Sequence, residues 1–236
     1  MNKLWLILLL VVSVSCHYYQ HDSISGNGRV KKAIISEDTI RSISISNKLN
    51  ALIIPSDTFR VELNADENLH EHIRTDIHNG HLTIYSEKHI RMAKMKEVMI
   101  FTNCMEKIEA SAGSNVYNTD SLNCDEIVIN ASSAADVSIK GNFQRIDIAA
   151  SSGSDLHLAG RAGYAIINLS SAADLQAYDF IIQDADVIVS SASDARVHVL
   201  GEARFDASSA ADIRYMGDPE IIESRTSSAA DIKKSK

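Results

Sequence analysis

The sequence predicts an all-β fold, a single-stranded parallel β-helix of about seven turns of about 19 residues each. The main observation is a repeated phrase of the type Ser-Ser-Ala-Ala-Asp, which occurs six times after a weaker first copy. Its closing residues, 18 to 21 positions apart, are Asn115, Asp136, Asp155, Asp174, Asp194, Asp212 and Asp231. This period is too short for a helical solenoid unit or a propeller blade, but it suffices for one β-helix turn. The usual crossover preference predicts a right-handed coil.

The segments on both sides of the phrase are predicted strands. Ile127-Val-Ile129 before it and Val137-Ser-Ile139 after it alternate with period two and are rich in β-branched residues. When the alternation is continued through the phrase, the first Ser of each pair faces water and the second faces the core. The Ala pair then forms a corner, and Asp closes it by bonding backbone amides. Glycines at 141, 160, 201 and 217 are expected to adopt positive φ where the second strand ends.

The first residues resemble an export signal. Residues 1–15 combine Lys3 with a short apolar run, which is too short to span a bilayer and is typical of a cleaved secretory leader. Cys16 follows small residues at the junction, as in bacterial lipoproteins, and we expect it to be lipidated; simple secretion or retention is the alternative. Residues 16–38 then form a polar tether behind this anchor.

Residues 39–236 form the predicted β domain. Its first part, 39–97, lacks the phrase but contains strands and a hairpin around Asn79-Gly80, whose two-residue turn is a strong hairpin signal. Asp66 to Arg74 is expected to form a short helix capped by Asp66. This part is either a cap on the first turn or the irregular early turns themselves, and the β-helix repeats occupy 98–236.

These parts occur in an order that resembles a known family, named "putative auto-transporter adhesin, head GIN domain". The resemblance rests on Ile40-Arg-Ser-Ile-Ser-Ile45, Val61-Glu-Leu-Asn-Ala65, Asn79-Gly-His-Leu-Thr-Ile84, Ile108-Glu-Ala-Ser-Ala-Gly-Ser-Asn115 and the repeated phrase. It covers nearly all of the chain after the leader. It implies an exported β-helix protein, many relatives carrying lipoprotein signals, and it implies no catalytic residue or cofactor.

Three sets of side chains are candidate sites. The Asp ladder (Asp136, Asp155, Asp174, Asp194 and Asp212) could supply oxygen ligands for Ca²⁺, although each turn offers one carboxylate and a purely structural corner is the alternative. A histidine-rich stretch could bind zinc or be a scattered surface set: His70, His72, His78, His81 and His89. Cys104 and Cys124 lie one turn apart, so they form either a disulfide or two reduced thiols.

Charge and motifs limit the function. Removal of the leader leaves 22 Lys+Arg against 31 Asp+Glu, a net charge of −9, which argues against nucleic acid and leaves the lipid anchor as the only predicted membrane contact. No nucleophile elbow, phosphate loop or zinc-protease motif occurs. We therefore expect a non-catalytic cell-envelope protein, an outer-membrane lipoprotein, that binds a surface glycan or protein. The alternative is a polysaccharide lyase or hydrolase. The C-terminal strand edge could also pair with another copy.

Overall fold

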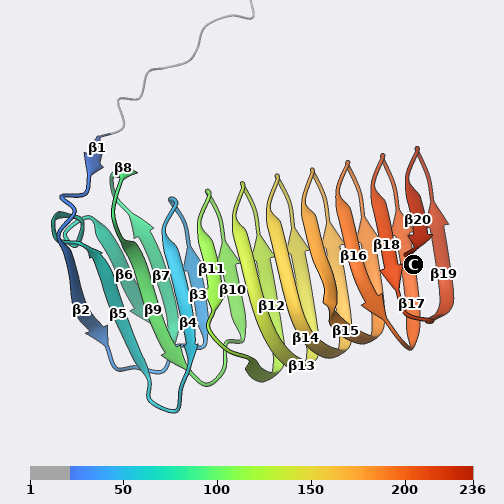
Figure 1. Ribbon diagram of the computed structural model, residues 1–236, viewed down its shortest axis with the longest axis horizontal. Coiled ribbons are helices and arrows are strands. Elements are labelled where there is room, and N and C mark those ends of the chain that lie inside the picture. Colours follow the sequence, from blue (N-terminus) through green and yellow to red (C-terminus); the bar gives the residue numbers. More distant parts are fainter. Residues whose placement is uncertain (1–21, 236) are drawn as a thin grey trace, which may run out of the picture.

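A computed structural model describes residues 22–235 and confirms the predicted fold class. Strands account for 66% of the described residues, and stacked parallel coils with about 19-residue spacing form a β-solenoid of about seven turns (Figure 1). A single 3₁₀ turn, Glu67–Leu69, is the only helical element in residues 22–235, and no helix there is long and apolar enough to cross a membrane. The predicted leader and Cys16 lie outside the described residues.

Each repeat is a flattened coil with two sides. A strand leaves the phrase, crosses the coil at the end opposite the phrase and returns to the next phrase, as β13 (Asp136–Ala150) does in one continuous run. We name the side after the phrase face A and the side before it face B. Face A contains β11 (Asn115–Asn118), the first parts of β13, β14 (Asp155–Leu169) and β15 (Asp174–Val189), then β16 (Asp194–Val199), β18 (Asp212–Met216) and β20 (Asp231–Lys234). Face B contains β10 (Lys107–Ala110), β12 (Leu122–Ala131), the second parts of β13, β14 and β15, then β17 (Glu202–Ala207) and β19 (Glu220–Thr226).

The N-terminal part continues the same two faces but not in chain order. Its strands are β2 (Val30–Ser36), β3 (Ser42–Ile45), β4 (Asn50–Pro55), β5 (Arg60–Asp66), β6 (Ile73–His78), β7 (His81–Ser86) and β9 (Lys96–Thr102). On face A the spatial order is β2, β5, β9, β4, β11; on face B it is β6, β7, β3, β10. The coil made by β3 and β4 therefore lies inside the stack. The outermost strands, β2 and β6, pair antiparallel with their neighbours and form this end of the stack (Figure 1).

Several expectations for this part need correction. The stretch expected to be a tether contains β1 (Ser23–Ser25), which pairs with β8 (His89–Met92), and β2, which pairs with β5. The Asn79-Gly80 hairpin is confirmed, with β6 and β7 in antiparallel register. The helix expected from Asp66 is reduced to the 3₁₀ turn, because the Asp66 carboxylate bonds distant backbone amides and caps nothing. Residue 98 is also no boundary, since solenoid pairing begins with β3 and β4.

Aliphatic ladders fill the space between the two faces. Val137, Leu156 and Leu175 are in register on face A, and all three are 0% exposed. Full burial of such a side chain stabilises the fold by roughly 1.5–3 kcal/mol. The period-two pattern therefore sets which side chains fill the core, and the outward positions are left free for function.

The phrase itself has a different conformation from the predicted one. The second Ser and the residue after it both lie in the left-handed region, as at Ser133 (φ 54°) and Ala134 (φ 58°), and both are exposed. Ala135 N–H donates to the Ser132 carbonyl over 3.2 Å, so each phrase is a tight turn of the type I′ class. The prediction that the second Ser faces the core is wrong, because alternation does not continue through a turn. The residue that points inward is the fourth of the phrase, such as Ala135.

The turns also bond to one another along the stack. The N–H of the third phrase residue donates to the carbonyl of the second Ser in the next coil, as Ala134 does to Ser152 and Ala172 to Ser191, each over 3.0 Å. The phrase therefore repeats because it builds one tip in every coil.

Candidate binding surfaces

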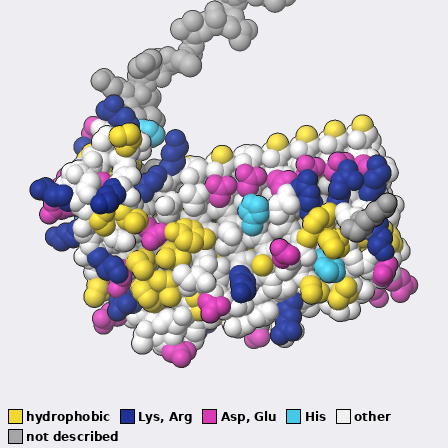
Figure 2. Space-filling model, viewed as in Figure 1, with side chains coloured by type: hydrophobic (Ala, Val, Ile, Leu, Met, Phe, Trp, Pro, Cys, Tyr) yellow, Lys and Arg dark blue, Asp and Glu magenta, His cyan; other side chains and the backbone are white. Residues whose placement is uncertain are grey.

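The phrase aspartates form one continuous row on face A. Asp136 pairs with Asp155, and the register continues through Asp174, Asp194 and Asp212 to Asp231. The row extends in the other direction through Asn115 and Asn50 to Glu97. Figure 2 shows these acidic side chains in a line below the turn tips. The predicted ladder is therefore real, and its carboxylates are exposed or half-buried.

Basic side chains accompany the last part of this row. Arg196 lies 3.1 Å from Asp174, Arg214 lies 3.4 Å from Asp212 and Lys233 lies 2.5 Å from Asp231. These partners stand two residues after the aspartate of their own coil, a position that holds Ser138, His157 and Gln176 in earlier coils. The acidic row is thus partly neutralised towards the C-terminal end.

The aspartate row offers no ready cation site. Within residues 22–235, no three carboxylate, imidazole or thiol groups converge in a way that could hold a metal ion. Calcium needs six to eight oxygen ligands, whereas each coil adds one carboxylate to a straight line. The calcium hypothesis remains an untested prediction without a coordination site.

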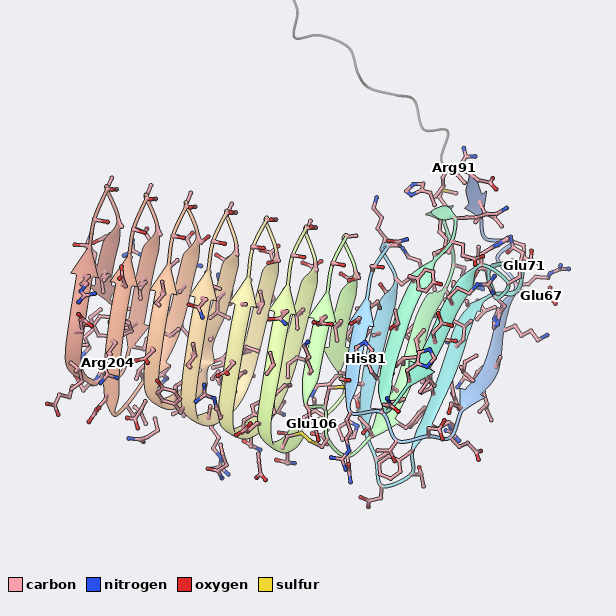
Figure 3. All side chains as sticks on the ribbon, turned by 180° about the vertical axis from the view of Figure 1, so that it is seen from behind. Glu67, Glu71, His81, Arg91, Glu106 and Arg204 are labelled. Carbon is pink, nitrogen blue, oxygen red and sulfur yellow. A yellow bond between two sulfur atoms is a disulfide. The ribbon has the colours of Figure 1, made fainter. Side chains whose placement is uncertain are left out.

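The histidines of the N-terminal part point to separate partners. His81 lies on face B (Figure 3), with Nδ1 2.8 Å from the Ser42 hydroxyl and Nε2 3.1 Å from the Ser44 hydroxyl. His70 Nε2 lies 3.0 Å from the Lys31 carbonyl, and His72 lies 3.3 Å from Glu71. His78 pairs with His81 across the hairpin, and His89 lies on β8. These histidines therefore correspond to the second interpretation given above, a scattered set of surface side chains.

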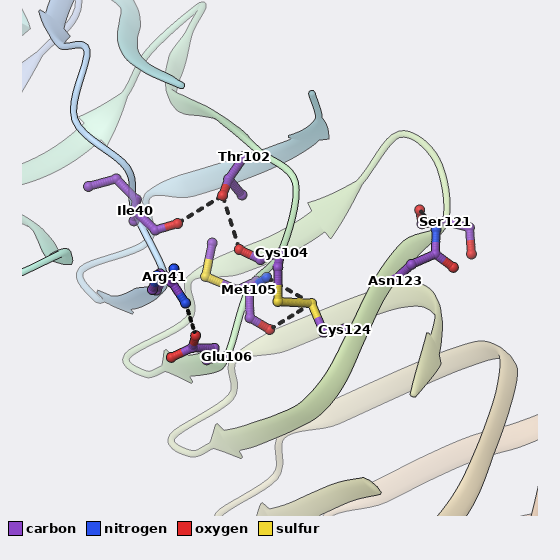
Figure 4. Close-up of a disulfide and its surroundings, with 9 residues drawn as sticks. All are labelled: Ile40, Arg41, Thr102, Cys104, Met105, Glu106, Ser121, Asn123 and Cys124. Atoms are coloured by element: carbon purple, nitrogen blue, oxygen red, sulfur yellow. Dashed lines mark hydrogen bonds and ion pairs between the residues drawn. A yellow bond between two sulfur atoms is a disulfide. The ribbon is translucent and has the colours of Figure 1, made fainter. Parts of the chain in front are cut away.

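Cys104 and Cys124 are joined by a disulfide with a Cα–Cα distance of 5.4 Å. The bond links the segment between β9 and β10 to β12 (Figure 4). Thr102 anchors the same segment, because its hydroxyl donates to the carbonyls of Ile40 (2.9 Å) and Cys104 (3.0 Å). The disulfide therefore fastens the place where the chain passes from its N-terminal part into the regular coils.

A long groove runs along face B beside the turns. It has a volume of about 840 Å³ and crosses β7, β3, β10, β12, β13, β14 and β15. The first Ser of the phrase lines it, as predicted for an outward position. The adjacent row is mixed and holds Thr83, Ser44, Glu109, Asn130, Ala149, Asn168 and Ile188. The polar lining includes Ser44, Ser46, Thr83, Ser111, Asn130, Ser132, Ser151, Asn168, Ser170 and Ser190. Sequence reasoning found the Ser row but missed the groove, because it needed the location of β3 and β7.

The groove has one charged lining residue, Glu109. Lys107 lies 2.6 Å from its carboxylate, and the Ser44 hydroxyl donates to it over 2.5 Å. These two contacts hold the pKa of Glu109 below its usual value of 4.5, so the carboxylate stays ionised and is a poor proton donor at neutral pH. A glycosidase needs a pair of carboxyl groups flanking the scissile bond, and the lining supplies only this one.

The deepest carboxylate of the N-terminal part has a structural role. Asp66 is 0% exposed and accepts backbone N–H bonds from Gly28 (3.0 Å), Lys94 (3.1 Å) and Met95 (3.0 Å). Burial by itself would raise the pKa of Asp66, but the three donors outweigh it, and the pKa lies below 3.8. Both carboxylate oxygens bind the chain's own backbone, so Asp66 holds together the segments around β2, β5 and β9.

Fold and groove together define a β-solenoid with an open groove on one face, lined by a row of Ser side chains and by aliphatic side chains. The chain belongs to the family described as "Putative auto-transporter adhesin, head GIN domain", whose model matches residues 40–219. No curated protein matches the chain significantly.

Solved structures share the fold at low sequence identity. A "putative adhesin" from Bacteroides fragilis matches with a TM-score of 0.82 and 16% identity, over 90% of this chain and all of that one. A "putative adhesin" from Parabacteroides merdae matches with a TM-score of 0.74 and 19% identity, over 91% of this chain and all of that one. A "putative lipid binding protein" from Parabacteroides distasonis matches with a TM-score of 0.72 and 17% identity, with the same coverage. At such identities the likeness establishes the fold alone.

Proposed function

We propose that this chain is a non-catalytic binding module of the adhesin type, exported to the cell envelope, whose face B groove holds one strand of an uncharged glycan. The observation that carries the proposal is the lining of the groove. Ser hydroxyls recur from coil to coil, Asn130 and Asn168 add amides in two coils, and the single carboxylate already has a cationic partner. Family membership is consistent with an adhesive role.

The groove suits an extended polymer better than a compact ligand. It crosses seven neighbouring strands, which at about 4.8 Å per strand amounts to roughly 29 Å. Its chemical groups repeat at this spacing, close to the length of one pyranose ring. A linear chain of similar units could therefore meet similar hydrogen-bonding partners on successive coils.

The residue types favour a neutral, hydroxyl-rich ligand. Ser and Asn side chains both donate and accept hydrogen bonds, as sugar hydroxyls do. No aromatic side chain lines the groove, so the affinity would come from many modest hydrogen bonds and would be low for short oligosaccharides. A lyase or hydrolase is less well supported, because convergent acidic and basic side chains are absent from the lining.

The proposed location follows from the first residues. A leader over 1–15 and a lipidated Cys16 would attach the solenoid to the outer membrane, six residues before the first described residue. Mass spectrometry of the mature N-terminus tests this part, and an unmodified Cys16 would contradict the anchor.

A glycan array tests the groove with the chain beginning at His17, which contains every described residue. We expect binding to neutral polysaccharides that strengthens with chain length. Ala149 lies on face B between Asn130 and Asn168, so Ala149→Tyr places a ring inside the groove and should abolish binding.

The matched control is Ser138→Tyr, which places the same ring on face A of the same coil. It should leave glycan binding unchanged. Equal loss of binding in both variants would mean a general effect on the fold, and unchanged binding in Ala149→Tyr would remove the groove from the proposal.

A further inference from the structure

The two ends of the solenoid differ in the direction of their outermost strands. At the N-terminal end, β2 and β6 run antiparallel to their neighbours, and their own outer edges have no strand partner among residues 22–235. At the other end, no strand of residues 22–235 pairs with the outer edges of β19 and β20. Figure 1 shows this end as the last open coil. An open edge presents unpaired N–H and C=O groups that can pair with another chain.

The free groups can be assigned from the hydrogen bonds of the last coil. In a parallel ladder, the N–H and C=O of one residue point to the same neighbour, and the direction alternates along the strand. Asp231 N–H donates back to Ala211 and Ser235 N–H donates back to Tyr215. Ile232 and Lys234 of β20 therefore point outward. On β19, Ser227 N–H donates back to Ala207, so Ser224 and Thr226 point outward.

Opposite charges flank the central free residue of each strand. Ile232 lies between Asp231 and Lys233, and Ser224 lies between Glu223 and Arg225. The flanking side chains share one surface of their strand, as their ion pairs demonstrate. When such a strand pairs antiparallel with a copy of itself about the central residue, each acid lies opposite a base on both sides.

We propose that the open end binds the open end of a second copy of this chain, through antiparallel pairing of β19 with β19 and β20 with β20 about a two-fold axis. At the centre, Ile232 exchanges two backbone hydrogen bonds with Ile232 of the partner subunit. Asp231 then lies opposite Lys233 of the partner subunit in a non-hydrogen-bonded pair, where side chains are closest. Around Ser224, Glu223 likewise lies opposite Arg225 of the partner subunit.

One axis can serve both strand pairs. A two-fold axis perpendicular to the two faces reverses the strand direction. It also places face A of one copy beside face A of the other, and face B beside face B. Ser228 and Ala229 form the tip of the last turn. Ser224 lies four residues before this tip and Ile232 lies three residues after it, so the two pairing centres are at nearly the same distance from the tip, one on each face. The contact is isologous and closes at the dimer, unlike a head-to-tail contact, which would give filaments.

The apolar surface of the last coil supports a buried contact. Ile221 is 39% exposed and Ile222 is 43% exposed, and both lie on β19 beside the proposed pairing. Pairing would place Ile222 opposite Thr226 of the partner subunit. It would also cover the side chains of Tyr215 and Ile232, which pack against the end of the core and are only partly buried in the single chain.

Charge reversal tests the register. Sedimentation velocity of the chain beginning at His17 should give a dimer at about 100 µM, a concentration that populates contacts of moderate affinity. Asp231→Lys creates two like-charge contacts per dimer and should weaken the dimer by about tenfold or more, and the double variant Asp231→Lys with Lys233→Asp should restore it. The control is Asp212→Lys, which breaks the same kind of ion pair one coil inside the edge and should leave the dimer intact.

A backbone variant tests the pairing itself. Ile232→Pro removes an N–H that has no acceptor among residues 22–235, so the protein should stay folded and become monomeric. A monomeric wild-type protein, species larger than a dimer, or an Ile232→Pro variant that dimerises like the wild type would each overturn the proposal.

Discussion

Asp66 illustrates how one residue can hold together strands that are distant in sequence. Its carboxylate binds the backbone of Gly28, Lys94 and Met95, which belong to the segments around β2 and β9. The sequence pattern predicted a helix cap here, because Asp before a polar stretch is a common N-cap. The actual partners lie 28 to 38 residues away in sequence, so no local pattern could identify them.

Asp66→Asn should lower stability by about 2–3 kcal/mol at neutral pH, because an ionised acceptor of three N–H bonds is replaced by a neutral amide. The folded pKa lies below the usual 3.8. The stabilisation by the carboxylate is therefore complete above pH 3.8 and is lost as the pH falls through the lower, folded pKa. Urea unfolding of both proteins from neutral pH down to about pH 3 measures this difference.

The control for this comparison is Asp57→Asn at an exposed position, which should change stability by less than about 0.5 kcal/mol. A stability difference between wild type and Asp66→Asn that did not shrink below pH 3.8 would contradict the assignment.

At the scale of the element, the turn phrase was only partly predictable. The repeat, its strands and the outward first Ser follow from periodicity. The left-handed pair does not, because Ser and Ala rarely adopt positive φ. The available signal was Gly113 and Gly153, which replace the third residue of the phrase in two copies and have φ of 69° and 67°. Glycine at one position of a repeat marks a backbone that other copies adopt at some strain.

Two glycines of one coil should therefore respond differently to alanine. Gly153→Ala reproduces the residue found at the same place in other turns, and nothing lies within 4 Å of the added Cβ, so stability should change by less than about 1 kcal/mol. Gly160 has a φ of 119°, and the Cβ added by Gly160→Ala would lie 2.0 Å from the Gly141 carbonyl oxygen. It should destabilise the fold by about 3 kcal/mol or more, because the stacked backbones must separate.

Thermal unfolding followed by circular dichroism compares the two glycine variants directly. Similar losses in both would mean that the turn is less tolerant than its repeated Ser-Ala pair implies. Of the four glycines expected at positive φ, Gly160 and Gly217 adopt it, whereas Gly141 and Gly201 do not. At Gly141 a Cβ would instead meet the Phe143 ring and the Leu122 carbonyl.

At the scale of the whole molecule, the unpredicted feature is the order of the coils. The regular part could be read from the sequence because each coil repeats the phrase and stacks on the preceding one. The N-terminal part carries no phrase, so no local pattern indicates where β3 and β4 lie. In the structure β3 lies between β7 and β10, and β4 lies between β9 and β11. The groove depends on this arrangement, since Ser44 and Thr83 form its N-terminal part. The site was therefore predictable only over the repeats.

This coil order gives a prediction for hydrogen exchange. Residues 42–55 lie near the start of the described chain, but their coil has a neighbour on both sides, so their amides should exchange as slowly as those of β13 to β15. The last coil has one neighbour, so β19 and β20 should exchange fastest among the strands of the phrase-bearing coils in dilute protein, where end-to-end pairing is absent. Peptide-resolved exchange mass spectrometry measures both regions in one experiment. Raising the protein concentration should then slow exchange in β19 and β20 while residues 42–55 remain unchanged. If residues 42–55 instead exchanged as fast as the edge strand β2, the interior location of their coil would be wrong.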